Sequence, residues 1–71
     1  MKVRKMDTTG HTTIELEGRE LKDHIDNAID SGYMALGISS AGQKFQIRPG
    51  FDLNSLQRFE SIDLIAAPVG G

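Results

Sequence analysis

The most informative segment of this chain lies near its middle and reads Arg19-Glu20-Leu21-Lys22-Asp23-His24-Ile25-Asp26-Asn27-Ala28-Ile29-Asp30-Ser31-Gly32. Four apolar residues in it share one face of a helix because they are spaced at i, i+4, i+7 and i+8: Leu21, Ile25, Ala28 and Ile29. Gly32 stands where a left-handed residue ends many helices. The segment predicts an amphipathic helix over residues 19–31. A helix of this length is marginal alone in water, so its apolar face has to be buried against a sheet.

The residues before this helix alternate between the two sides of an extended chain. Met1 and Val3 lie on one side of the first segment, and residues 12–17 alternate again and are rich in β-branched types. Thr9-Gly10 between them is a turn signal. These residues predict a β-hairpin that ends at Gly18.

Alternation returns after the helix and predicts three more strands, separated by a turn and one short helical turn. The strands are expected at residues 33–38, 44–48 and 62–65, the turn at 39–42 and the helical turn at 52–59. One helix cannot cover both faces of a sheet, so it should lie across one side. We therefore expect an α+β fold with a mixed sheet of four to five strands packed on one helix. The predicted core is Val3, Ile14, Leu16, Leu21, Ile25, Ile29, Leu36, Ile38, Phe45, Ile47, Leu56, Ile62 and Leu64.

Composition excludes several classes of protein. The 71 residues are enough for one domain, and the absence of cysteine excludes disulfides, thiolate metal sites and cysteine nucleophiles. A formal net charge of −2 does not suit binding to nucleic acid or to anionic lipid. No apolar run approaches the ~20 residues of a membrane span. A soluble cytoplasmic protein is the expectation.

Residues that could carry catalysis or bind a metal are sparse. His11 and His24 are the two histidines, and without cysteine they make a weak zinc site. The acidic residues of the helix lack the spacing of a calcium loop, and no serine stands in a nucleophile elbow. We expect no catalytic residue, no metal site and no bound cofactor.

Two segments carry a resemblance to known families. The hairpin Thr9-Gly10-His11-Thr12-Thr13-Ile14-Glu15-Leu16-Glu17 resembles the first hairpin of ubiquitin, and Gly70-Gly71 resembles the diglycine of ubiquitin. Ala67-Pro68-Val69-Gly70-Gly71 is similar to the end of the molybdopterin-synthase sulfur carrier. The order of elements resembles the β-grasp order over nearly the whole chain. Unlike ubiquitin, this chain has no basic residue after Arg58, which brings it nearer to the sulfur carriers.

The resemblance implies a β-grasp domain at residues 1–65 followed by a diglycine tail at residues 66–71. It implies that a partner enzyme, using ATP and Mg²⁺, adenylates the carboxyl group of Gly71, while Gly70 gives steric access. Pro68 and Val69 would contact that enzyme, and Pro68 would stiffen the approach because its φ is restricted. The chain would then be a substrate and carrier and not an enzyme.

Three functions remain open at this point. Transfer to a lysine amine through a conjugating enzyme would make the chain a protein modifier, and transfer of sulfur by a sulfur-transfer partner would make it a sulfur carrier. The alternative is a non-covalent β-grasp adaptor that binds a partner through its sheet. All three would use a recognition surface on the sheet face away from the helix, where we expect Ile65, Ala35 and Tyr33.

Overall fold

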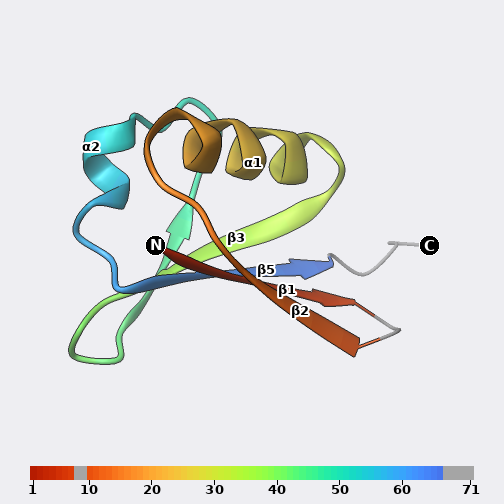
Figure 1. Cartoon of the computed structure of the whole chain (residues 1–71), viewed down its shortest axis with the longest axis horizontal. Helices are drawn as coiled ribbons and strands as arrows, with labels where there is room; N and C mark the ends of the chain where they lie inside the picture. The colour runs from red at the N-terminus through yellow and green to blue at the C-terminus, as the bar shows by residue number, and fades with distance from the viewer. Residues whose placement is uncertain (8–9, 67–71) are drawn as a thin grey trace.

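Five strands and two helices follow one another in the computed structural model, which describes residues 1–7 and 10–66 (Figure 1). Their order is the predicted one. They are β1 (Lys2–Asp7), β2 (Gly10–Glu15), α1 (Gly18–Asp30), β3 (Tyr33–Ile38), β4 (Lys44–Ile47), α2 (Leu53–Leu56) and β5 (Ser61–Ala66).

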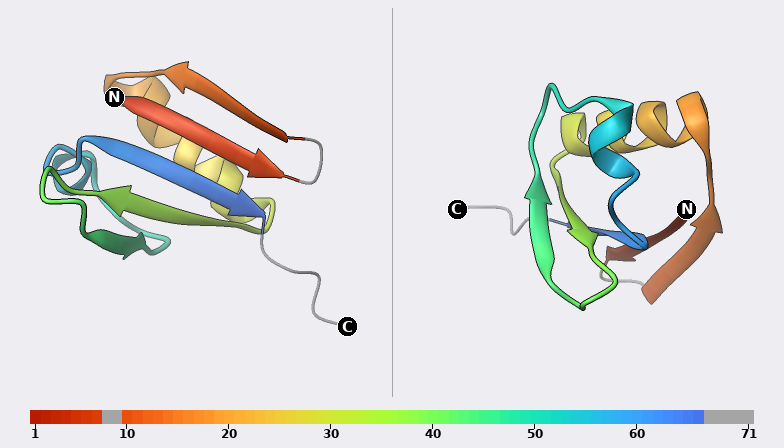
Figure 2. Two further views of the ribbon diagram at one scale, coloured as in Figure 1. Left: turned by 90° about the horizontal axis from the view of Figure 1, so that it is seen from below. Right: turned by 90° about the vertical axis from the view of Figure 1, so that its left-hand side faces the viewer.

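The strands form one mixed sheet in the order β2-β1-β5-β3-β4. The first and last strands of the chain, β1 and β5, are parallel neighbours at its centre, and the other three pairings are antiparallel. Both helices lie on one side of this sheet, and in the view from below the other side shows the five strands without a helix over them (Figure 2). The expected α+β class with a mixed sheet packed on a helix is confirmed.

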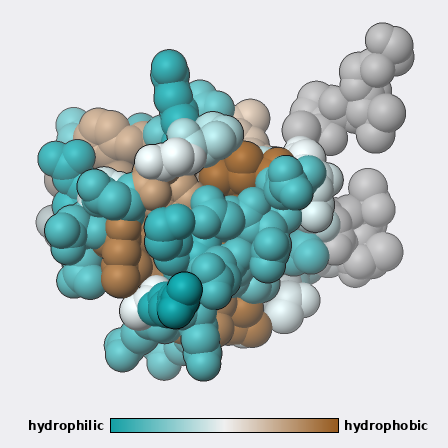
Figure 3. All heavy atoms as spheres, turned by 90° about the horizontal axis from the view of Figure 1, so that it is seen from above, coloured by the Kyte–Doolittle hydropathy of each residue, from teal (hydrophilic) through white to brown (hydrophobic). Residues whose placement is uncertain are grey.

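Helix α1 forms where the apolar spacing predicts it. Its buried residues are Leu21, Ile25 and Ala28, while its outward residues are polar, and hydrophilic surface covers most of the helix side of the molecule (Figure 3). Gly32 has φ +99°, a left-handed value that glycine adopts without strain, and its N–H donates to the carbonyl oxygen of Ile29 at 3.0 Å. Among the described residues, neither helix has the length and apolar character needed to cross a bilayer.

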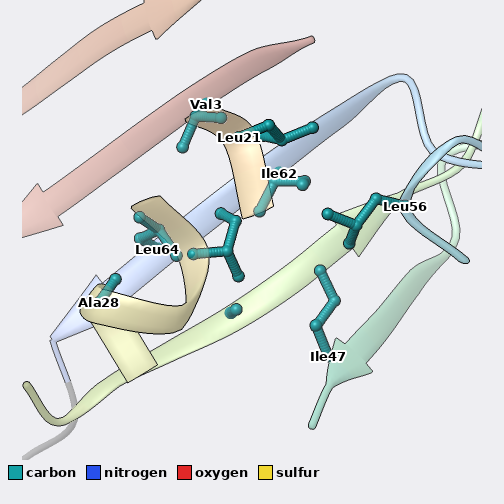
Figure 4. Close-up of a cluster of buried hydrophobic side chains, with 9 residues drawn as sticks. Val3, Leu21, Ala28, Ile47, Leu56, Ile62 and Leu64 are labelled. Carbon is teal, nitrogen blue, oxygen red and sulfur yellow. The ribbon is translucent and has the colours of Figure 1, made fainter. Parts of the chain in front are cut away.

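The core lies between α1 and the central strands, with α2 closing one end (Figure 4). Seven residues of the predicted core are buried there, together with Ala28 from the predicted apolar face of the helix and Ala35, whose burial was not predicted. The seven are Val3, Leu21, Ile25, Ile47, Leu56, Ile62 and Leu64. Leu16 and Ile29 are half-buried against this cluster.

Four predicted core residues lie elsewhere. Ile14 and Phe45 are 37% and 48% exposed because they belong to the edge strands β2 and β4, which the single long helix does not cover. Leu36 and Ile38 are half-buried, and their strand β3 turns them away from α1.

The orientation of β3 is the main difference from the prediction. In its register with β5, Ala35 pairs with the buried Leu64 and Gly37 with the buried Ile62, so Ala35 and Gly37 face α1. The physical reason is space. A Cβ at Gly37 would overlap the ring of Phe59. β3 can therefore pack this closely against the helix side of the core only with its small residues, Ala35 and Gly37, facing inward.

Candidate functional site

The candidate site is the sheet face away from α1, called here the open face. Because side chains alternate along a strand, the residues next to the buried ones in β1, β5 and β3 point to this face. Strand register arranges them in three rows across β1, β5 and β3: Met6, Ile65 and Met34; then Arg4, Asp63 and Leu36; then Lys2, Ser61 and Ile38.

An ion pair occupies the centre of the open face. Arg4 Nε donates to Asp63 Oδ1 at 3.0 Å and Arg4 Nη2 donates to Asp63 Oδ2 at 3.2 Å, so the guanidinium holds both carboxylate oxygens. The Asp63 side chain is only 5% exposed, whereas that of Arg4 is 44% exposed. A buried carboxylate needs such a partner, because an unpaired buried charge is strongly unfavourable. The pair thus places a fixed cation at the surface of the face.

An apolar row lies beside this ion pair. Met6, Ile65 and Met34 are register partners on adjacent strands, so their side chains are neighbours across the face. Met34 is 38% exposed, and Met6 and Ile65 are half-buried. Together with Leu36 in the next row they give the open face apolar surface beside the Arg4–Asp63 ion pair, a combination that suits protein recognition.

The apolar row stands at the end of β5. Ile65 is followed by Ala66, which is exposed and is the last residue of the strand. Ala66 belongs to β5, where it pairs with Tyr33 of β3, although the sequence analysis placed residue 66 in the tail.

Of the three predicted recognition residues, the structure brings only Ile65 to the open face. Ala35 is fully buried against α1, and Tyr33 is half-buried on the same side of β3, packed against the core. Lys5 Nζ lies 4.7 Å from the centre of the Tyr33 ring, which covers that ring further. The placement of Ala35 and Tyr33 on the open face was wrong, because the alternation of β3 is shifted by one residue.

The predicted tail residues Pro68, Val69, Gly70 and Gly71 lie outside the described residues. The prediction that Gly71 carries the reacting carboxyl group therefore stays a prediction.

Sequence reasoning missed Met34, Met6 and the Arg4–Asp63 pair as members of the face. One signal was present for Met34: both sets of alternating residues in β3 are uncharged, and one of them contains the small Ala35 and Gly37. Small residues favour the side on which a helix approaches closely. For the ion pair there was no signal, since its members are 59 positions apart in the sequence.

The described residues hold no group of three His, Asp or Glu side chains that could bind a metal ion. Comparisons of the chain with models of protein families, with curated proteins and with solved structures found no match.

Proposed function

We propose that this chain is a β-grasp, ubiquitin-like carrier whose Gly71 carboxyl group is adenylated by a partner enzyme. The observation that carries the proposal is the strand order β2-β1-β5-β3-β4 with α1 after the first hairpin, combined with a diglycine that begins four residues after the end of β5. In a β-grasp protein this order puts the last strand at the centre of the sheet. The segment after β5 therefore starts from a central strand that is paired on both sides, and not from an edge strand.

The proposed reaction involves the carboxyl group of Gly71 and ATP bound by the partner enzyme. A carboxylate oxygen of Gly71 attacks the α-phosphorus of ATP, and pyrophosphate leaves. The resulting acyl-adenylate then reacts with a nucleophile at the carbonyl carbon, and AMP leaves. Glycine suits this position because, without a Cβ, its backbone can enter a narrow channel. The scheme applies whether Gly71 is the last residue made or is exposed by a protease.

Two nucleophiles lead to two products. An enzyme thiolate, followed by a lysine amine, gives an isopeptide bond to a target protein. A persulfide gives an acyl disulfide, which a thiol then reduces to a thiocarboxylate. The absence of a basic residue after Arg58 supports the second product by resemblance, and nothing in the open face separates the two.

The open face supports the proposal as the surface that positions the tail in the partner. The apolar row of Met6, Ile65 and Met34 stands where β5 ends, so one partner can hold this row and the diglycine at once. The same row would serve a non-covalent adaptor, which is the second candidate function. Only the carrier requires the carboxyl group of Gly71.

The test is mass spectrometry of the protein recovered from its native cells. A carrier would appear either as a remnant of Gly71 on target lysines or with one terminal oxygen replaced by sulfur. Removing Gly71 should abolish both forms while leaving the fold, read by circular dichroism, unchanged. If the chain lacking Gly71 still supports the cellular process that the full chain supports, the carrier proposal is wrong and the adaptor function is favoured.

A further inference from the structure

The outer edge of β4 is a second surface with the properties of a binding site. β4 is the last strand in the sheet order and pairs only with β3 among the described residues, so its other side presents unpaired backbone N–H and C=O groups. Lys44, Phe45 and Gln46 in it are exposed.

An aromatic groove runs along this edge, between β4 and the segment around α2. It is an open, shallow groove of about 420 Å³, lined by all three phenylalanines of the chain: Phe45, Phe51 and Phe59. The rings of Phe45 and Phe59 lie 6.0 Å apart between centroids and are tilted by 33°. Phe45 is 48% exposed, and the rings of Phe45 and Phe59 also line a smaller hollow of about 210 Å³. The groove thus offers exposed apolar surface beside an open strand edge.

The charge along the aromatic groove is positive. Arg48 and Arg58 line it, Arg58 lines the smaller hollow as well, and no Asp or Glu lines either one. No ion pair of the described residues involves these two arginines. Lys44 of β4 is a further exposed cation at the same sheet edge, on the side away from Phe45. This excess of positive charge is local, because the whole chain has a net charge of −2. Two other hollows on the molecule are each lined by two acidic residues, Glu17 with Glu60 and Asp26 with Asp30.

We propose that the β4 edge and the aromatic groove bind an extended peptide segment of a partner protein in which apolar residues alternate with acidic ones. An added strand satisfies the backbone groups of the β4 edge by hydrogen bonds. Its residues point alternately to the two sides of the sheet, so every second one faces Phe45 and Phe59. Carboxylates at the remaining positions point to the side of the sheet that carries Lys44, and carboxylates at the ends of the segment reach Arg48 and Arg58, which line the groove.

The inference is independent of the diglycine and of the apolar row of the open face, although Lys44, the partner of Ile38, points to the open side of the sheet at its outer edge. Phe45 pairs with Gly37 and lies on the helix side of the sheet, opposite to Met34 and Leu36. A partner on this groove therefore leaves the open face and the end of β5 accessible. Because β4 has only four residues, few backbone bonds can form, and the affinity should be modest, with a dissociation constant in the micromolar range.

The experiment uses the full chain and a fluorescein-labelled, acetylated peptide, Glu-Leu-Glu-Val-Glu-Leu-Glu, with Lys-Leu-Lys-Val-Lys-Leu-Lys as its charge-reversed control. Fluorescence anisotropy should show saturable binding of the acidic peptide and at least about tenfold weaker binding of the basic one. Amide chemical shifts and hydrogen exchange on the ¹⁵N-labelled chain should then change at residues 44–48 and 58–59.

Three variants separate the groove from general electrostatic attraction. Arg58→Glu reverses a groove cation and Phe45→Ala removes an exposed ring; each should weaken binding about tenfold or more. Arg19→Glu makes the same charge reversal on α1, away from the groove, and should change binding less than twofold. All three positions are outside the core, so circular dichroism should show an unchanged fold.

Three results would overturn the proposal. They are equal binding of the two peptides, an equal loss for Arg19→Glu and Arg58→Glu, or shift changes centred on Met34 and Ile65 on the open face.

Discussion

Single side chains explain two features that the alternation of residues along the strands does not reveal: the orientation of β3 and the burial of Asp63. Gly37 leaves room for the ring of Phe59, and with Ala35 it turns the small side of β3 toward the helix. Asp63 looks in the sequence like an ordinary polar residue between Ile62 and Leu64 of β5, yet its carboxylate is buried and held at both oxygens by Arg4. Both features depend on one contact between residues far apart in the chain.

The Arg4–Asp63 pair makes an asymmetric prediction for stability. Arg4→Met leaves a buried carboxylate without its cation, whereas Asp63→Asn leaves a half-exposed guanidinium that water can solvate. We expect Arg4→Met to lower the free energy of unfolding by about 1–3 kcal/mol and Asp63→Asn to lower it by clearly less. Urea unfolding of both single variants and the double variant measures the difference and the coupling. A larger loss for Asp63→Asn would mean that the carboxylate is hydrated and not buried.

At the level of elements, the two helices begin differently. The N-cap residue of α2, Asp52, accepts a hydrogen bond from the backbone N–H of Ser55 at 2.8 Å. The N-cap residue of α1, Glu17, makes no such bond and only approaches the N-terminal amine of Met1 at 3.9 Å, with its side chain 91% exposed. Helix α1 is therefore held by its apolar face and not by its cap.

The missing cap predicts a stabilising substitution. Glu17→Ser would put a hydroxyl at the N-cap three positions before Glu20, which is the spacing of a capping box. The free energy of unfolding should rise by about 0.5–1 kcal/mol, because the loss of the exposed contact with Met1 costs little. Thermal or urea unfolding measures the change, and Glu17→Ala, which cannot cap, serves as the control. A similar gain with alanine would show that the effect comes from removing the glutamate.

For the molecule as a whole, one helix layer on a five-stranded sheet decides which residues are available to partners. The layer covers the centre of one face and leaves the open face and both sheet edges uncovered in the described part of the chain. As a result, three of the larger apolar residues of β3 and β4, Met34, Leu36 and Phe45, lie at least partly at the surface.

Adjacent positions in β3 test this arrangement. Met34→Glu should change the free energy of unfolding by less than about 1 kcal/mol, because the side chain is on the open face. Ala35→Glu should prevent folding, because burying an unpaired charge costs several kcal/mol against a total stability of about 4–10 kcal/mol for a domain this small. Urea unfolding and near-ultraviolet circular dichroism distinguish the two variants. The reverse result would restore the original assignment of Ala35 and Tyr33 to the open face.

The sequence alone determined the elements and their order, because the periods of helix and strand are local properties of neighbouring residues. The spacing of Leu21, Ile25 and Ala28 specified α1, and alternation specified the strands. The sequence is also the sole basis for the role proposed for the diglycine, and that role rests on resemblance. Tertiary structure decided which side of β3 faces the helix, since both sides are uncharged and the small size of Ala35 and Gly37 takes effect only where Gly37 meets the ring of Phe59. It likewise decided that Arg4 meets Asp63 and that Phe45, Phe51 and Phe59 line one groove, because these residues come together only after β1, β5 and β4 have taken their places in the sheet.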